Sequence, residues 1–235
     1  MIKMSLDQTF NTQGYIIFRN LLDKKLLQEC RNEIITFIKS SKGLSNAGGI
    51  SIPDFISLKE FIVTNNLRNN CRIHEALKSI LGTNYRFCRH NDIGIDRLVP
   101  WHQDKLNGKY SKYETHNIWT FHEGEEQVIV KVLIYLQDHI TDGGLYLVPG
   151  SHKSKKILKS PAQHLDVKLG DVVIFDQRIS HRGTLSHPVS KKERILVSFG
   201  FGRNNIFTDN FERGTIARQL DQSGQMKKRW SKKIK

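Results

Sequence analysis

The sequence predicts an α+β domain whose strands form a sandwich or jelly roll. Residues up to 82 carry apolar side chains at helical spacing, whereas from residue 83 onward short β-prone segments alternate with loops rich in Gly, Pro, Asn and Asp. Helices followed by a run of strands are typical of an α+β domain. A chain of 235 residues suits one such domain. We expect a single domain over residues 1–225, with a helical front (1–82) and a β core (83–205), followed by a basic tail (226–235).

The helical front begins with a short strand and an amphipathic helix. A β-branched run follows Gly14, and Asp23 then stands where a helix N-cap is expected. Apolar residues recur at three- and four-residue spacing up to residue 40, which predicts a helix. These residues are Leu26, Leu27, Cys30, Ile34, Ile35 and Ile38. Two further helices are predicted over 56–66 and 69–81, the second ending at Gly82, a residue favoured after a helix C-terminus.

The β core contains five strand-like segments. Each is rich in Val, Ile, Leu, Phe or Tyr and is bounded by turn residues, which is typical of short strands in an antiparallel arrangement. The segments are YRFCRHNDIGI (85–95), EQVIVKVLIYLQD (126–138), GLYLVPG (144–150), DVVIFD (171–176) and ERILVSFGFG (193–202).

Composition restricts the setting and the partners. No apolar run reaches the roughly 18 residues that span a bilayer, and the N-terminus lacks the pattern of a secretory signal, so we expect a cytoplasmic protein without a membrane partner. Three cysteines without CxxC spacing suggest neither a disulfide framework nor a thiolate zinc site. The formal net charge is +14, and six Lys or Arg lie in the last ten residues. Such a tail is usually a solvated end, although it permits weak contact with a polyanion.

Three His-x-Asp tripeptides raise the question of a metal site. They are HND (90–92), HQD (102–104) and HLD (164–166). A mononuclear non-haem Fe(II) site of the oxygenase type needs two imidazoles and one carboxylate, with the remaining positions open. Alternate residues of an extended chain project to one side, so His102 and Asp104 can converge while Gln103 points away. The second imidazole must come from another segment.

His181 offers the second imidazole, because it follows the strand-like segment 171–176 and precedes Gly183. Three predicted strands separate HQD from His181, enough chain to cross between two sheets and return. Between HLD and His181 there is room for a single strand only, which makes that pairing difficult. Chain length does not exclude HND. The residues therefore favour HQD and leave HND as an alternative.

Arg194 is the residue best suited to bind a carboxylate near this iron. A 2-oxoglutarate that chelates iron through its 1-carboxylate and keto oxygen extends its 5-carboxylate away from the metal and needs a cation there. The arginine fork pairs bidentately with a carboxylate and stays charged when partly buried. Arg182 adjoins the proposed ligand and should face the opposite side, and Arg203 lies outside the strand-like run. A surface ion pair remains the alternative role for Arg194.

The order of these motifs resembles the phytanoyl-CoA dioxygenase family of Fe(II)/2-oxoglutarate oxygenases. The resemblance covers roughly residues 8–203, through GYIIFRNLL, WHQD, LIYLQDHITDGGLYLVPGSHK, GDVVIFDQRISHRG and ERILVSFGF. The segment DGGLYLVPGSHK is its most specific part, because the family shows an Asn/Asp-Gly, an apolar strand and then Pro-Gly-Ser/Thr-His-Lys/Arg between the metal ligands. This segment fixes HQD as the partner of His181, and His152 within it is expected to be a structural turn residue.

The resemblance implies a double-stranded β-helix with the N-terminal helices packed on one sheet. It also implies Fe(II) at His102, Asp104 and His181, 2-oxoglutarate at Arg194, O2 as the oxidant, and hydroxylation with release of succinate and CO2. Lys131 is a second candidate contact to 2-oxoglutarate, because alternation places Lys131 and Leu133 on the face that lines the pocket. Desaturation, ring closure and epoxidation would use the same ligands. The substrate and the oligomeric state are left open.

The stretch 105–125 reads as a substrate lid beside the proposed iron. It is long for a connection and rich in aromatic residues, and loops of this length are usually functional or disordered. An ordinary packed excursion is the alternative. The candidate substrate contacts are Gln103, Tyr110, Tyr113, Trp119 and Phe121. The basic composition favours a small anionic substrate, although net charge concerns encounter more than site chemistry.

Two other functions are compatible with the same residues. A cupin-like metal-binding or isomerase module would share the sandwich without needing Arg194. A nucleic-acid demethylase would apply the iron chemistry to a flipped base, and the basic tail permits it, but the sequence contains no dedicated base-reading motif. A small-molecule substrate is therefore favoured over nucleic acid.

Overall fold

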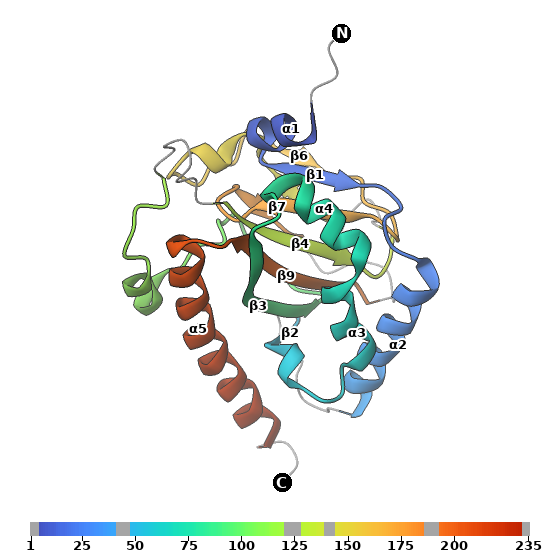
Figure 1. The fold of residues 1–235 in the computed structure, drawn as a ribbon. Coiled ribbons are helices and arrows are strands. Elements are labelled where there is room, and N and C mark those ends of the chain that lie inside the picture. Colours follow the sequence, from blue (N-terminus) through green and yellow to red (C-terminus); the bar gives the residue numbers. More distant parts are fainter. Residues whose placement is uncertain (1–4, 41–47, 120–127, 139–143, 186–192, 232–235) are drawn as a thin grey trace.

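Two antiparallel sheets form the centre of the computed structural model, which describes residues 5–40, 48–119, 128–138, 144–185 and 193–231. The larger sheet has six strands in the order β1-β7-β4-β9-β3-β2. Their bounds are β1 (Tyr15–Phe18), β2 (Ile50–Pro53), β3 (Tyr85–Ile95), β4 (Ile129–Tyr135), β7 (Val172–Asp176) and β9 (Ile195–Arg203). The smaller sheet, in the order β6-β5-β8, consists of β5 (Tyr146–Leu147), β6 (Gln163–His164) and β8 (His181–Arg182). Two sheets with the N-terminal helices on one side agree with the predicted α+β class (Figure 1).

The N-terminal helices cover one face of the larger sheet. Figure 1 shows α2 (Lys24–Ser40), α3 (Ile62–Asn66) and α4 (Cys71–Leu81) on the same side of it, and α1 (Leu6–Gln13) at the β1 edge. Leu27 and Leu77 from the helices belong to one buried cluster with Val132 and Phe199 from the strands. Each such side chain contributes roughly 1.5–3 kcal/mol by leaving water, so this cluster is the main core.

The helical front agrees with the sequence at α2 and α4. The Asp23 carboxylate accepts hydrogen bonds from the backbone N–H groups of Lys25 (2.8 Å) and Leu26 (3.0 Å), as expected for an N-cap. Asn70 caps α4, and Gly82 ends it with φ of +78°.

The predicted helix over 56–66 was wrong in its extent. The chain instead forms the short 3-10 turn η1 (Phe55–Ser57), an irregular link, α3, and the 3-10 turn η2 (Leu67–Asn69). The Glu33 carboxylate on α2 accepts hydrogen bonds from the N–H groups of Val63 (2.9 Å) and Thr64 (2.8 Å). A contact from a distant helix thus satisfies the start of α3, and local spacing could not reveal it.

A long C-terminal helix, α5 (Ile206–Ser231), was not predicted. It lies beside β3 and β2 (Figure 1) and continues through 226–231, which the sequence analysis treated as a separate basic tail. Its inward face is largely polar, so it lacks the apolar stripe that identifies an amphipathic helix. The buried polar residues are Thr208, Asn210, Thr215 and Gln219. Among the described residues, no helix combines the length and hydrophobicity that a membrane crossing requires.

The inner face of the larger sheet carries polar groups toward the smaller sheet. On β4, Lys131, Leu133 and Tyr135 line a cavity between the sheets, whereas Val130 and Val132 belong to the core under the helices. Lys131 and Leu133 therefore share a face, as alternation predicts. The register of β3 against β9 shifts between Phe87 and Asn91, at a bulge where Arg89 has φ of +62°. Bulges of this kind redirect side chains near active sites.

Candidate functional site

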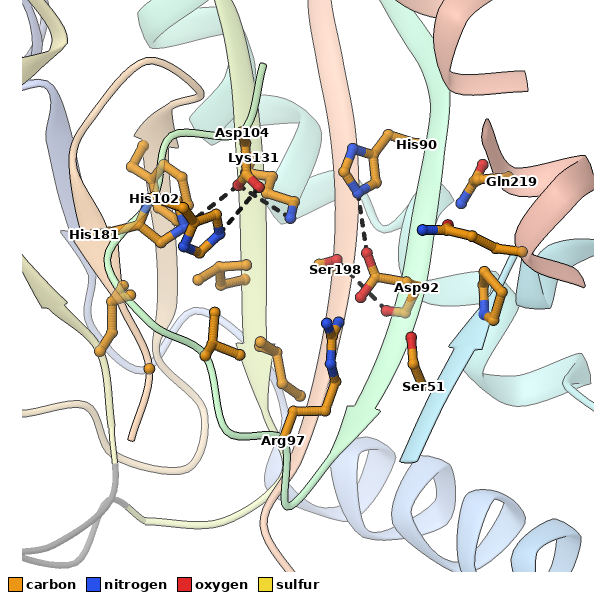
Figure 2. Close-up of a pocket in the computed structure, with 18 of the residues that line it drawn as sticks. Ser51, His90, Asp92, Arg97, His102, Asp104, Lys131, His181, Ser198 and Gln219 are labelled. Carbon is orange, nitrogen blue, oxygen red and sulfur yellow. Dashed lines mark hydrogen bonds and ion pairs between the residues drawn. The ribbon is translucent and has the colours of Figure 1, made fainter. Parts of the chain in front are cut away.

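Three side chains from two segments form one cluster of metal-ligand type. The ligand atoms of His102, Asp104 and His181 all lie within 4.8 Å of one another. His102 Nε2 is 3.4 Å from Asp104 Oδ1, and His181 Nε2 is 3.4 Å from Asp104 Oδ2 (Figure 2). An antiparallel bridge joins the backbones of the two histidines through hydrogen bonds of 2.9 and 3.0 Å. Backbone pairing thus holds both imidazoles beside the carboxylate.

Both imidazoles present the same nitrogen to this cluster. His102 Nδ1 lies 2.8 Å from the carbonyl oxygen of Pro100, and His181 Nδ1 lies 3.0 Å from that of Ile179. A carbonyl oxygen only accepts, so each Nδ1 carries a hydrogen and each Nε2 is the nitrogen that faces the cluster. Backbone carbonyls fix ring orientation in this way in metal-ligating histidines. The tautomers therefore suit coordination of a cation through Nε2.

The local electrostatics favour the metal-binding forms of His181 and Asp104. Burial is the largest influence on His181 and lowers its pKa to about 3, against the opposing effect of Asp104. Burial also disfavours the Asp104 carboxylate, but Lys131 and the two histidines outweigh it and hold the pKa of Asp104 well below its usual range. Lys131 Nζ is 3.1 Å from Asp104 Oδ2. A neutral His181 imidazole beside an ionised Asp104 carboxylate matches the histidine and carboxylate donors that Fe(II) oxygenases use.

The other two His-x-Asp tripeptides form no such cluster. Among the described residues, His102, Asp104 and His181 are the one group with metal-ligand spacing. His90 Nε2 instead pairs with Asp92 Oδ2 at 3.0 Å on β3. Asp166 is exposed and forms an ion pair with Lys168 at 2.9 Å. His152 is buried in the 3-10 turn η4 (Ser151–Lys153), with Nε2 3.2 Å from the carbonyl oxygen of Asn11, away from the cluster.

A cavity of about 260 Å³ opens in front of the three ligands. It lies between the two sheets and reaches from the metal-ligand cluster to α5. Figure 2 shows the cluster at one end and the His90–Asp92 pair at the other, with Arg97 extending between them. The polar lining residues beyond the ligands are Ser51, His90, Asp92, Arg97, Lys131, Tyr135, Ser198, Arg218, Gln219 and Gln222. The apolar lining includes Val99, Leu133, Leu145, Phe175 and Leu196.

Arg194 stands just before β9 with part of its guanidinium unsatisfied. Its Nη2 donates to the carbonyl oxygen of Arg97 at 3.0 Å, while Nη1 is buried and has no hydrogen-bond partner among the described residues. Burial lowers the pKa of Arg194, and Asp96 and Tyr135 act in the opposite direction. Tyr135 lines the cavity, although Arg194 itself is not part of that lining. A buried guanidinium nitrogen with no partner is costly and fits the carboxylate of a bound cosubstrate.

Most of the side chains predicted to contact the substrate interact with other parts of the protein. None of Gln103, Tyr110, Tyr113 and Trp119 lines the cavity, and Phe121 lies outside the described residues. Gln103 points away from the cluster and donates to the carbonyl oxygen of Ser154 at 2.9 Å.

The described part of the predicted lid packs on α5. Its 3-10 turn η3 (Gly108–Tyr113) contacts this helix, and Tyr110 donates to Asp221 at 2.7 Å. Tyr113 packs against a small cluster that contains Phe211 of α5. The described residues of this stretch, 105–119, thus resemble a packed excursion, because α5, which was not predicted, provides a surface for them.

The residues at the α5 end of the cavity are not identifiable from the sequence. HND was considered only as a metal ligand pair, and Arg97 lies in the loop before His102. Arg218 and Gln219 come from the helix that was not predicted. These two residues lie in a segment without hydrophobic periodicity, so nothing in the local sequence indicates that they line a cavity.

Comparison with known proteins agrees with this geometry. The family model described as phytanoyl-CoA dioxygenase (PhyH) matches residues 10–187. No curated protein sequence matches the chain. Among solved structures, HygX from Streptomyces hygroscopicus with nickel and 2-oxoglutarate bound is 20% identical, with a TM-score of 0.65 over 83% of this chain and 85% of HygX.

Two further structures share the fold. The α-ketoglutarate-dependent epimerase SnoN from nogalamycin biosynthesis is 14% identical, with a TM-score of 0.64 over 84% of this chain and 82% of its own. The non-haem monooxygenase ThoJ, as a nickel complex, is 15% identical, with a TM-score of 0.65 over 85% of this chain and 77% of its own. These similarities confirm the jelly-roll core, and the family match supports Fe(II), 2-oxoglutarate and O2 as cofactors. The chain belongs to the phytanoyl-CoA dioxygenase family of Fe(II)/2-oxoglutarate-dependent oxygenases.

Proposed function

We propose that the protein hydroxylates an unactivated carbon of a small molecule, with conversion of 2-oxoglutarate and O2 to succinate and CO2. The observation that carries this proposal is the cluster of His102, Asp104 and His181, which opens onto a cavity. Two imidazoles and one carboxylate leave positions for 2-oxoglutarate and oxygen, and the substrate carbon must approach through the same opening. When bound, Fe(II) with 2-oxoglutarate supplies the oxidising power that these side chains lack.

Each residue of the site has a distinct task in this proposal. His102, Asp104 and His181 hold the metal, and the carbonyl groups on their Nδ1 atoms keep the rings in place. Arg194 binds the distal carboxylate of 2-oxoglutarate through its buried Nη1. Lys131 pairs with Asp104 at 3.1 Å. In this proposal it either contacts the cosubstrate or neutralises the charge of the metal-bound carboxylate.

The relatives support a small-molecule substrate and leave the outcome of the oxidation open. One HygX structure contains hygromycin B together with nickel and 2-oxoglutarate, and SnoN is an epimerase. The sequence identity of both proteins to this chain is so low that the similarity shows a shared fold and not a shared reaction. We therefore favour hydroxylation as the default outcome, and succinate release without a hydroxylated product would redirect the proposal to another oxidation.

The proposal is tested by cosubstrate binding and turnover. Anaerobic protein with Fe(II) and 2-oxoglutarate should show a weak visible charge-transfer band, and on exposure to air it should release succinate slowly even without substrate. Arg194→Leu should weaken 2-oxoglutarate binding by about 2–5 kcal/mol, the scale for truncating one partner of a buried charge pair, with iron affinity nearly unchanged. Arg194→Lys should recover only part, because an ammonium group lacks the bidentate fork.

The matched control is Arg203→Leu, at the far end of β9, which should keep the wild-type affinity for 2-oxoglutarate. Iron binding without the band and without succinate would contradict the oxygenase proposal and favour a cupin-like metal-binding module. Wild-type affinity in Arg194→Leu would move the anchor of 2-oxoglutarate to Lys131 or another cation. Screening small molecules for faster succinate release then addresses the substrate.

A further inference from the structure

Two guanidinium groups line the cavity beyond the metal ligands. Arg97 comes from the loop after β3, and Arg218 comes from α5. Among the described residues, neither forms an ion pair with a carboxylate. Arg218 Nη2 instead lies 3.4 Å from His90 Nδ1. Arginines that line a cavity without a counterion are typical of sites that bind oxyanions.

The fold holds both arginines beside the His90–Asp92 pair. The 3.0 Å contact between His90 Nε2 and Asp92 Oδ2 orients the imidazole, so that Nδ1 faces Arg218. The aliphatic stem of Arg97 crosses Gly94, where an added Cβ would lie 3.1 Å from its Cδ. Gln219 next to Arg218 donates to the carbonyl oxygen of Asn91, which fixes that turn of α5 against β3.

The charges that line the cavity do not balance. Lys131, Arg97 and Arg218 face two carboxylates, Asp92 and Asp104. Asp92 already has His90 as a partner and lies in the field of Lys131 and Arg97, which hold its pKa below the usual range although burial opposes this. Bound Fe(II) would add two positive charges and 2-oxoglutarate two negative ones, so the loaded cavity would keep its excess of positive charge. A substrate that carries a negative charge would remove this excess.

We propose that Arg97 and Arg218 form a subsite that binds an oxyanion group, a carboxylate or a phosphate, of the substrate. This inference rests on the proposed oxygenase function. The cavity extends from the metal ligands past Arg97 to the His90–Asp92 pair (Figure 2), and Arg218 contacts His90, so the subsite anchors one part of the substrate and leaves another part to face the metal. Arg97 and Arg218 are thus specificity-determining residues, distinct from Arg194, which serves the cosubstrate.

The subsite is tested by chemical protection of arginines. Protein loaded with Ni(II) and saturating 2-oxoglutarate is treated with phenylglyoxal, which modifies guanidinium groups, and each arginine is followed by mass spectrometry. Inorganic phosphate in one arm and acetate in the other serve as probes. We expect one of the two anions to slow modification of Arg97 and Arg218 by about tenfold, a loss of reactivity that corresponds to binding at both groups. Protection by phosphate indicates a phosphorylated substrate, and protection by acetate indicates a carboxylate.

Variants provide a second measurement that does not depend on turnover. Arg218→Gln should raise about tenfold the anion concentration that is needed to protect Arg97, because one of the two charge-assisted contacts is lost. Arg213→Gln is the matched control, since Arg213 is exposed on the same helix and bonds Asn210 at 2.6 Å. That control should leave the protection of Arg97 unchanged.

Two results would overturn the proposal. Equal protection of Arg97, Arg218 and Arg213 by either anion would mean general screening of a basic surface. Protection of Arg97 and Arg218 when 2-oxoglutarate is added to the Ni(II) protein without phosphate or acetate would assign both to the cosubstrate. The outcome also separates the two proposals: a protein without charge-transfer band or succinate release that still shows selective protection would retain the oxyanion subsite and lose the oxygenase function.

Discussion

At the scale of single residues, the metal-ligand cluster depends on two backbone carbonyls as much as on three side chains. The carbonyl oxygens of Pro100 and Ile179 accept from the Nδ1 atoms of His102 and His181, which directs both Nε2 atoms toward Asp104. Each carbonyl belongs to the residue two positions before its histidine, so the loop that delivers the ligand also sets its tautomer. Such supporting contacts typically affect metal affinity 10- to 100-fold in proteins.

The first prediction concerns iron binding. Metal-free protein should bind one Fe(II), and His102→Ala, Asp104→Ala and His181→Ala should each abolish that binding, because two remaining donors cannot hold the ion. Equilibrium dialysis followed by metal analysis measures the stoichiometry. His90→Ala and His164→Ala are the controls and should keep wild-type stoichiometry. Loss of iron in His90→Ala with retention in His102→Ala would show that the wrong tripeptide was chosen.

The sequence predicted the metal ligands at one end of the cavity but not the residues at the end beside α5. His102, Asp104 and His181 stand in a compact motif and a strand-end position, and both features are visible in the sequence. The partners of Asp92 and the cavity face of Arg218 result from a bulge in β3 and from the packing of α5. Neither the bulge nor the packing of α5 is visible in local spacing, and the contact between Arg218 and His90 joins residues 128 positions apart.

At the scale of elements, helices with an apolar buried face were predicted from the sequence, whereas the helix with a polar buried face was not. α2 and α4 bury apolar stripes and were predicted almost to their ends. α5 buries Thr208, Thr215 and Gln219, so hydrophobic periodicity could not reveal it. β4 and β9 carry apolar residues toward the helices and a mixture of polar and apolar residues toward the cavity, and their runs in the sequence were correctly assigned as strands.

The second prediction concerns the junction of α1 and β1. Gly14 ends α1 with φ of +80°, and a Cβ at this position would overlap the imidazole of His152, which is buried and bonded to Asn11. Gly14→Ala should therefore lower the free energy of unfolding by roughly 2–4 kcal/mol, from the left-handed backbone and the displaced ring. Urea unfolding measures this change. Gly224→Ala within α5, where a Cβ meets no atom within 4 Å, should be neutral or slightly stabilising, and a similar loss in both variants would contradict the steric explanation.

At the scale of the whole molecule, metal binding and folding are linked. The ligands lie on two segments, the loop after β3 and β8, and an unfolded chain cannot hold them together. A ligand that binds only the folded state stabilises it by about 2.7 kcal/mol at a concentration of 100 times Kd.

The third prediction follows from this linkage. Anaerobic Fe(II) should raise the thermal midpoint of the wild type in a concentration-dependent manner, and a chelator should reverse the increase. Asp104→Ala should show no increase, and His164→Ala should respond like the wild type. Calorimetry of the three proteins with and without Fe(II), and of the wild type with the chelator, measures the effect. An equal increase in Asp104→Ala would place the stabilising metal elsewhere in the protein.

The fourth prediction concerns acid stability of the metal-free protein, and it depends on His90. Burial is the main cause that lowers its pKa from 6.5 to about 4. As the pH falls below 6.5, the unfolded chain takes up a proton on His90 before the folded protein does, so the free energy of unfolding should fall between about pH 6.5 and 4, by up to about 3 kcal/mol from this residue. His181, with a pKa of about 3, adds a loss in the same direction. Urea unfolding from pH 7 to pH 4 measures the slope, and His90→Gln should flatten it in part, because glutamine does not titrate. If the wild type and His90→Gln lost stability in parallel, His90 would not be held neutral beside Asp92, and the account of how the charges are arranged at the α5 end of the cavity would have to be revised.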